Sequence, residues 1–169
     1  LLLRTHGITK NPALMSKNDG GWYQEMLLLG YNYRLSDILA TLGNSQLQRA
    51  NEGMQQRQQI AQRYMAAFKD TNVQYTHIPN GVYHGYHLIV IQTEHRLKLY
   101  NHLQSQQIFA QVHYVPCHLH PYYRQQGWTD GDMPHAEHYY SRTLSLPMYP
   151  TLTNQQQDFV IEQVLAICG

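Results

Sequence analysis

Two polar residues, Asn32 and Arg34, lie just before an expected helix start and could bind an anion. The helix is predicted to begin at Ser36, whose hydroxyl can accept a hydrogen bond from a free N–H, and Asp37 adds negative charge at the positive end of the helix dipole. Exposed N–H groups and a guanidinium favour a phosphate or carboxylate ligand. From the spacing alone we favour a simpler interpretation, an ordinary capped helix whose Arg34 pairs with a surface carboxylate.

Eleven histidines raise the question of metal binding and acid–base chemistry. His135 and His138 would lie on one face of an expected helix, as a metal pair requires. No HExxH or CxxC motif occurs, however, and no third ligand has a recognised spacing, so we expect no metal site. Glu137 could act as a general base, but a single carboxylate on an amphipathic helix is usually only solvated. The sequence also has no glycine-rich phosphate loop.

Composition excludes several classes of partner. The 169 residues carry a net charge of +1 without a run of like charges, so neither nucleic acid nor an acidic membrane surface is indicated. No apolar run approaches the length of a membrane span. Cys117 and Cys168 lie far apart outside any paired motif, which predicts a reduced, cytoplasmic chain. The apolar start without an initiating Met suggests a piece of a longer protein.

Helical and extended patterns alternate along the chain and would position these residues. A helix tail ending at Gly7 and a polar loop over 8–29 precede the capped helix. Apolar periodicity then predicts further elements: helices over about 36–49, 52–68, 94–107, 133–143 and 153–167, and extended segments over 73–75, 86–91, 108–114 and 144–148. Such alternation in the second half indicates a small layered α/β unit.

Seven motifs appear in order along nearly the whole chain: RTHGI at 4–8, GYNYRLSD at 30–37, ATLGNSQL at 40–47, YHL at 86–88, QVHYVP at 111–116, AE at 136–137 and LSLPMYP at 144–150. Together they resemble the second half of the DegT/DnrJ/StrS-type sugar aminotransferases, which use pyridoxal phosphate (PLP) and have fold type I. The forms AQVHY at 110–114 and GITK at 7–10 look most like members that aminate C4 of a UDP-linked 4-keto-6-deoxy sugar in pseudaminic acid synthesis.

The resemblance implies a fold, a cofactor and partners. The α/β chain would be the carboxy-terminal portion of a fold type I transferase, with the end of the large PLP-binding domain over 1–50, a connecting helix over 51–70 and the small α/β domain over 71–169. The resemblance also implies PLP, a nucleotide-sugar substrate, glutamate as amino donor by family habit, and a cytoplasmic homodimer with shared active sites.

Roles near the phosphates follow from the same resemblance. Asn32 matches the asparagine that reaches across the dimer interface to the PLP phosphate of the neighbouring subunit. Arg34, with Tyr31 and Tyr33 around it, matches positions near the nucleotide-sugar and cofactor phosphates. A planar bidentate donor suits a diphosphate, and the tyrosine rings suit a base or sugar face.

Roles at the sugar pocket are implied in the second half of the chain. His113 and Tyr114 match a motif at the pocket edge, where ring donors could orient the substrate, and His6 is carried over on a less specific match. Tyr33, Tyr114 and His87 could instead pack at an interface or in the core, and for His87 we favour that interpretation.

The departure from the family concerns the reactive lysine, which lies upstream of the RTHGI segment in the family and is absent here. Lys10 and Lys17 lie downstream, in a polar loop, so neither is assigned that role. We therefore expect no catalytic residue in this chain and no transamination by the chain alone. Two alternatives stay open: a non-catalytic binding or dimerisation module, and a related dehydratase in which histidine replaces the lysine.

Overall fold

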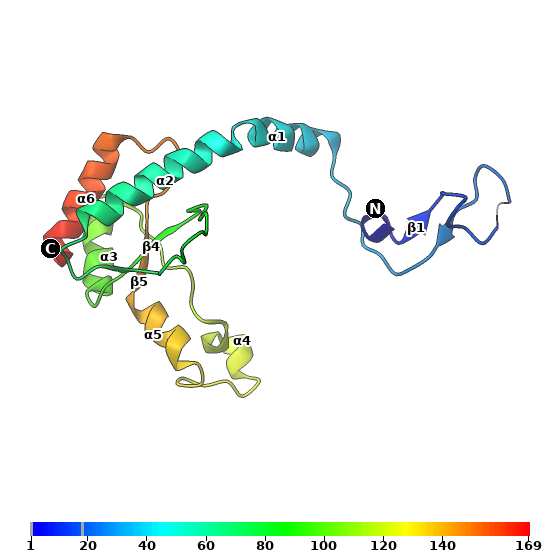
Figure 1. Ribbon diagram of the computed structural model, residues 1–169. Helices are drawn as coiled ribbons and strands as arrows, with labels where there is room; N and C mark the ends of the chain where they lie inside the picture. Colours follow the sequence, from blue (N-terminus) through cyan, green and yellow to red (C-terminus); the bar gives the residue numbers. More distant parts are fainter. Residues whose placement is uncertain (1, 18) are drawn as a thin grey trace. The chain divides into compact units, whose positions relative to one another are not determined.

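The computed structural model describes residues 2–17 and 19–169 and separates into two units, Leu1–Arg49 (the first unit) and Ala50–Gly169 (the second unit; Figure 1). Within the described residues, no helix is long and apolar enough to cross a membrane.

The first unit is a short hairpin followed by one helix. A 3-10 turn, η1 (Leu2–Arg4), leads into β1 (Ile8–Thr9), which pairs antiparallel with β2 (Glu25–Met26). The predicted helix tail is thus a single turn, and Gly7 follows it with a φ of 73°. A Cβ at Gly7 would lie 1.7 Å from the Leu28 carbonyl oxygen, so only glycine fits this close backbone approach.

The carboxylate of Glu25 organises the loop between the two strands. It accepts hydrogen bonds from the Ser16 amide at 2.8 Å, the Ser16 hydroxyl at 2.7 Å and the Tyr23 hydroxyl at 2.9 Å. Because these donors, the Ser16 hydroxyl first, favour the ionised form, they lower the pKa of Glu25 to about 2. The polar loop predicted over 8–29 therefore has a defined internal anchor.

Helix α1 (Asp37–Gln48) begins as predicted, but it buries none of its residues. The Ser36 hydroxyl accepts a hydrogen bond from the Leu39 amide at 3.4 Å, which is an N-cap contact. None of its twelve residues is buried, and Ile38 is 82% exposed. The apolar stripe of this helix is therefore available to a surface outside the first unit's described residues.

The second unit combines a three-stranded antiparallel sheet with helices. Its strands are β3 (Gln74–Tyr75), β4 (Ile89–Gln92) and β5 (Thr143–Leu146), paired in the order β3-β4-β5. Its helical elements are α2 (Ala50–Ala67), α3 (Arg96–Ser105), η2 (Cys117–Leu119), α4 (Pro121–Arg124), α5 (Pro134–Arg142) and α6 (Asn154–Cys168). The bounds of α2, α3, α5 and α6 agree with the predicted helices to within a few residues, whereas η2 and α4 were not predicted.

One hydrophobic core joins α2, α3 and α6 to the sheet. Its fully buried members come from all four parts: Tyr64, Phe68, Ile91, Leu99, Leu103, Leu144 and Val164. Burial of such side chains contributes about 1.5–3 kcal/mol each, so this unit has the apolar packing that the first unit lacks. The Thr153 capping box starts α6 as predicted.

Two predicted strands are shorter than expected, for local reasons. Tyr86 has a φ of 42°, and Arg57 binds the carbonyl oxygens of Tyr86 and His87 at 3.2 and 3.3 Å, so extended pairing starts only at Ile89. The segment 108–114 forms one isolated bridge, between Gln111 and Ser145. A turn-like bond from the Ala110 amide to the Ile108 carbonyl bends the chain and prevents a longer ladder.

Candidate phosphate and sugar site

The segment containing Asn32 is held by backbone hydrogen bonds to η1 and to the residues just after it. The Tyr31 amide donates to the Leu3 carbonyl at 2.6 Å, and the His6 amide donates to the Tyr31 carbonyl at 2.9 Å. An antiparallel bridge joins Thr5 to Asn32. The structure thus places His6, Tyr31 and Asn32 in one small region of the first unit, although they are separated in sequence.

The tyrosines on either side of Asn32 form an exposed aromatic stack. The rings of Tyr31 and Tyr33 are nearly parallel, 10° apart, with centroids separated by 4.9 Å, and their residues are 60% and 70% exposed. Because side chains alternate along an extended segment, Asn32 lies on the opposite side of the backbone. One segment therefore presents a flat apolar surface on one side and an amide on the other.

The polar side chains of this segment are free to bind a ligand. Asn32 and Arg34 are both exposed, and neither side chain forms a hydrogen bond or ion pair with the described residues. The interpretation that Arg34 pairs with a surface carboxylate is therefore wrong within this part of the chain. An amide and a guanidinium just before a capped helix are suitable donors for a phosphate.

His113 and Tyr114 lie together in the second unit. His113 Nδ1 is 2.8 Å from the Ser145 hydroxyl oxygen, and its ring contacts that of Tyr114 edge to face at 4.8 Å. Tyr114 is 76% exposed, whereas Ser145 is buried on β5. His113 is thus oriented by the sheet, with Nε2 left without a partner among the described residues, and Tyr114 projects outward.

His87 does not pack in the core. It is exposed just before β4, because Arg57 binds its carbonyl oxygen and the adjacent residue Tyr86 has the buried side chain. It lines a cavity of about 350 Å³ together with His77 and His84. The prediction of core packing for His87 is therefore wrong, and an interface role stays a prediction.

The two lysines of the loop lie at the surface of the first unit. Lys17 Nζ forms an exposed ion pair with Asp19 at 2.7 Å and lies 5.2 Å from the Tyr23 ring centroid. Lys10 is exposed in the same loop. A nucleophilic lysine needs a desolvated site or a neighbouring cation, and neither residue has one among the described contacts.

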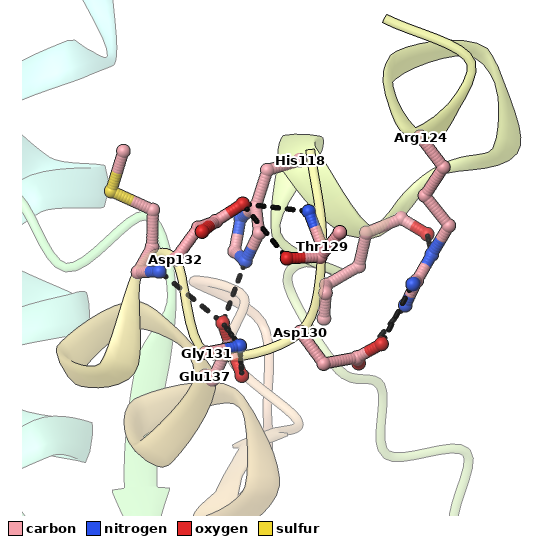
Figure 2. Close-up of polar contacts among 9 residues, drawn as sticks. His118, Arg124, Thr129, Asp130, Gly131, Asp132 and Glu137 are labelled. Atoms are coloured by element: carbon pink, nitrogen blue, oxygen red, sulfur yellow. Dashed lines mark hydrogen bonds and ion pairs between the residues drawn. The ribbon is translucent and has the colours of Figure 1, made fainter. Parts of the chain in front are cut away.

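Glu137 belongs to a hydrogen-bonded cluster that sequence analysis missed. Its carboxylate oxygen Oε1 lies 2.8 Å from His118 Nε2 and accepts from the Gly131 amide at 2.8 Å and the Met133 amide at 3.3 Å (Figure 2). The His118 hydrogen bond is the main cause that lowers the pKa of Glu137. The prediction of a merely solvated carboxylate is wrong, and a carboxylate engaged in this way is poorly suited to act as a general base.

The neighbouring histidines, His135 and His138, remain exposed. In the described part of the chain, no group of three or more His, Cys, Asp or Glu side chains could hold a metal ion. Only the nineteen-residue separation of His118 and Glu137 is visible in the sequence, and that separation has no recognised meaning.

Residues 1–165 match the model of the DegT/DnrJ/EryC1/StrS aminotransferase family. Among curated proteins, the spore coat polysaccharide biosynthesis protein SpsC of Bacillus subtilis is 36% identical over 96% of this chain and 44% of its own length. The chain therefore spans less than half the length of this relative.

Solved structures match over almost the whole chain. Helicobacter pylori PseC, an aminotransferase involved in the biosynthesis of pseudaminic acid, is 28% identical with a TM-score of 0.83, covering 98% of this chain and 44% of that chain. The PLP form of the sugar aminotransferase Spr1654 from Streptococcus pneumoniae, assigned as putative, is 25% identical with a TM-score of 0.84, covering 98% and 41%. The mixed helix and strand arrangement is thus that of the corresponding part of fold type I aminotransferases.

Proposed function

Because this chain belongs to the DegT/DnrJ/EryC1/StrS aminotransferase family, we propose that it is the carboxy-terminal portion of a nucleotide-sugar aminotransferase. The observation that carries this proposal is the free, exposed pair Asn32 and Arg34 ahead of the Ser36 N-cap. We assign residues 1–50 to the end of the large domain, 51–70 to the connecting helix and 71–169 to the small domain. The division of the chain into two units between Arg49 and Ala50 supports the first of these boundaries.

PLP is the cofactor that we propose for the whole enzyme. When bound, it supplies the electron sink for moving an amino group between donor and keto sugar. In this chain the Asn32 amide would donate to the PLP phosphate of the neighbouring subunit in a cytoplasmic homodimer. The Arg34 guanidinium would bind a nearby phosphate. Both donors fit a phosphate because they are exposed and lack partners among the described residues.

The substrate proposed is a UDP-linked 4-keto-6-deoxy sugar, with glutamate as amino donor. The parallel rings of Tyr31 and Tyr33 offer a surface for the base or sugar, and His6 lies beside them. His113 Nε2 and the Tyr114 hydroxyl would orient the sugar at the pocket edge. PseC supports a pseudaminic acid type of pathway, while SpsC, with the higher identity, supports the wider class of polysaccharide precursors.

The chain alone would not transaminate. Neither Lys10 nor Lys17 has the surroundings that a reactive lysine requires, so that lysine would come from the part of the enzyme preceding this chain. An alternative is a non-catalytic module for nucleotide-sugar binding or dimerisation. The unburied apolar stripe of α1, which includes Ile38, favours this alternative because it supplies an interface without chemistry.

A borohydride experiment tests the missing lysine. The purified chain is incubated with PLP, reduced with borohydride and examined by intact-mass and peptide mass spectrometry. We expect only sparse labelling spread over surface lysines, with Lys69→Arg as a matched control for such labelling. Stoichiometric labelling at Lys10 or Lys17, lost on replacement by Arg, would contradict the proposal that the reactive lysine lies elsewhere.

A further inference from the structure

Residues 113–118 form a short segment, here called the pocket-edge segment, that is anchored at both ends. Two residues before its start, the Gln111 amide donates to the Ser145 carbonyl at 3.2 Å, and the Ser145 amide donates to the Gln111 carbonyl at 2.7 Å. His113 adds the contact of its Nδ1 with the Ser145 hydroxyl. At its end, His118 is bound to Glu137. Between the anchors, Tyr114 and Val115 are exposed.

Both anchors belong to one continuous stretch of structure. Glu137 lies in α5 and Ser145 in β5, and β5 starts at the residue that follows the end of α5. The strand is buried along its whole length and is paired with β4. The pocket-edge segment is therefore fixed relative to the sheet at two points of a single support.

The Glu137 anchor has the features of a strong, oriented contact. His118 is 8% exposed and the Glu137 side chain 23%, so solvent competes weakly for their hydrogen bond. The Gly131 and Met133 amides donate to the same oxygen, Oε1, and the Gly131 amide also lies 3.0 Å from Oε2 (Figure 2). A hydrogen bond to an ionised acceptor is about twice as strong as one between neutral groups. The cluster leaves Glu137 little freedom to move.

An ion pair between Arg124 and Asp130 in the same region offers a comparison. Arg124 binds Asp130 through two nitrogens, at 2.6 and 2.9 Å, and its Nε donates to the Leu119 carbonyl (Figure 2). Arg124 and Asp130 are exposed, and Asp130 does not contact His118 through any hydrogen bond. Replacing Asp130 removes its pair with Arg124 while the His118–Glu137 hydrogen bond stays in place, although Arg124 also supports the Leu119 carbonyl next to His118.

We propose that His118 and Glu137 form a positioning pair, which holds the pocket-edge segment so that His113 and Tyr114 face the sugar of the substrate. This inference rests on the proposed function, since the role of His113 and Tyr114 comes from it. Neither member of the pair is assigned contact with substrate. Their effect is transmitted through the backbone between Tyr114 and His118.

Hydrogen exchange on this chain tests the anchoring. We expect exchange of the Leu119 and His120 amides, which donate to the Pro116 and Cys117 carbonyls, to rise about tenfold or more in Glu137→Ala, because a local opening replaces the native contact. Glu137→Gln, which keeps an acceptor for the backbone amides, should recover part of the protection. Asp130→Ala, which leaves the His118–Glu137 hydrogen bond in place, should raise this exchange less than Glu137→Ala does. Unchanged exchange in Glu137→Ala, with α5 still folded by the same measurement, would overturn the proposal.

Half-reaction kinetics on the full-length enzyme test the positioning role. Glu137→Ala should raise the KM for the keto sugar about tenfold or more, because misplacing a binding group by about 1 Å is costly. The half-reaction with the amino donor should keep its rate, which a general loss of structure would not allow. An unchanged sugar KM overturns the positioning role. A wild-type enzyme that fails to turn over any nucleotide-linked keto sugar overturns the proposed function instead, and leaves the exchange result to judge the anchoring.

Discussion

Tyr31 and Tyr33 stack with their ring centroids 4.9 Å apart and their planes 10° from parallel, on the segment that also carries Asn32. Both rings are largely exposed, so the stack covers no core. An aromatic surface of this kind is typical of sites that bind a base or a sugar face. This stack is the basis of the ligand-binding role proposed for the first unit.

Replacing Tyr33 by Ala should weaken nucleotide-sugar binding by the full-length enzyme roughly tenfold, since an aromatic pair contributes about 0.5–1.5 kcal/mol beyond its buried area. Binding is measured by titration calorimetry with the nucleotide sugar. Tyr33→Phe, which keeps the ring, serves as the matched control and should bind nearly as wild type. Equal affinity of Tyr33→Ala and wild type would contradict a ligand-binding role for the stack.

Replacing Asn32 by Ala should lower the affinity of the full-length dimer for PLP about tenfold, because a hydrogen bond to a charged phosphate contributes about 1.5–3 kcal/mol. The stability of the isolated chain should stay unchanged, since the Asn32 side chain is exposed and makes no bond within the described residues. PLP retention after dialysis measures the effect. Asn44→Ala, on exposed α1, is the control. A similar loss in both variants would argue against a specific phosphate contact.

Acid should release the loop held by Glu25. The pKa of Glu25 is lowered from 4.5 to about 2, because the folded state favours the ionised carboxylate. The contribution of this carboxylate to stability is therefore fully present above pH 4.5. It is lost as the pH falls from about 4.5 toward 2. Amide exchange of residues 16–25, compared across this window, should show protection falling with pH after correction for the intrinsic rate. Glu25→Gln should lack this dependence, and a pH-dependent loss of the same size in the variant would refute the assignment.

Replacing Arg57 by Ala should destabilise the second unit by about 2 kcal/mol, because the guanidinium binds three carbonyl oxygens, those of Tyr86, His87 and Met148. Urea unfolding measures the change. Arg57→Lys should recover part of it, since all three contacts are made by the one nitrogen Nη1 and a lysine ammonium also offers several donors on one nitrogen. Gln55→Ala, on the exposed face of α2, is the control. Stability equal to that of this control would mean that the three contacts carry little energy.

Local features were predictable from the sequence because they depend on near neighbours. The N-caps at Ser36 and Thr153 and the helices that follow them arise from hydrogen bonds within three residues. The motif order alone indicated the family that the comparison of residues 1–165 then showed. The loop motif with Asn32 and the motif with His113 were also visible in the sequence. Their proposed roles stay predictions.

Contacts between distant residues decided the rest. Arg57 donates hydrogen bonds to the carbonyl oxygens of Tyr86 and His87, which lie 29 and 30 positions further along the chain. These bonds shorten the strand expected at 86–91. Glu137 finds His118 across a turn and a short helix, which converts an apparently solvated carboxylate into an anchor. The exposure of α1 likewise depends on tertiary structure. Its apolar periodicity predicts that one face of the helix is covered, but it does not identify the surface that covers it. Local hydrogen bonds depend on residues that are neighbours in the sequence. Contacts between side chains of distant residues depend on where the folded backbone places their segments.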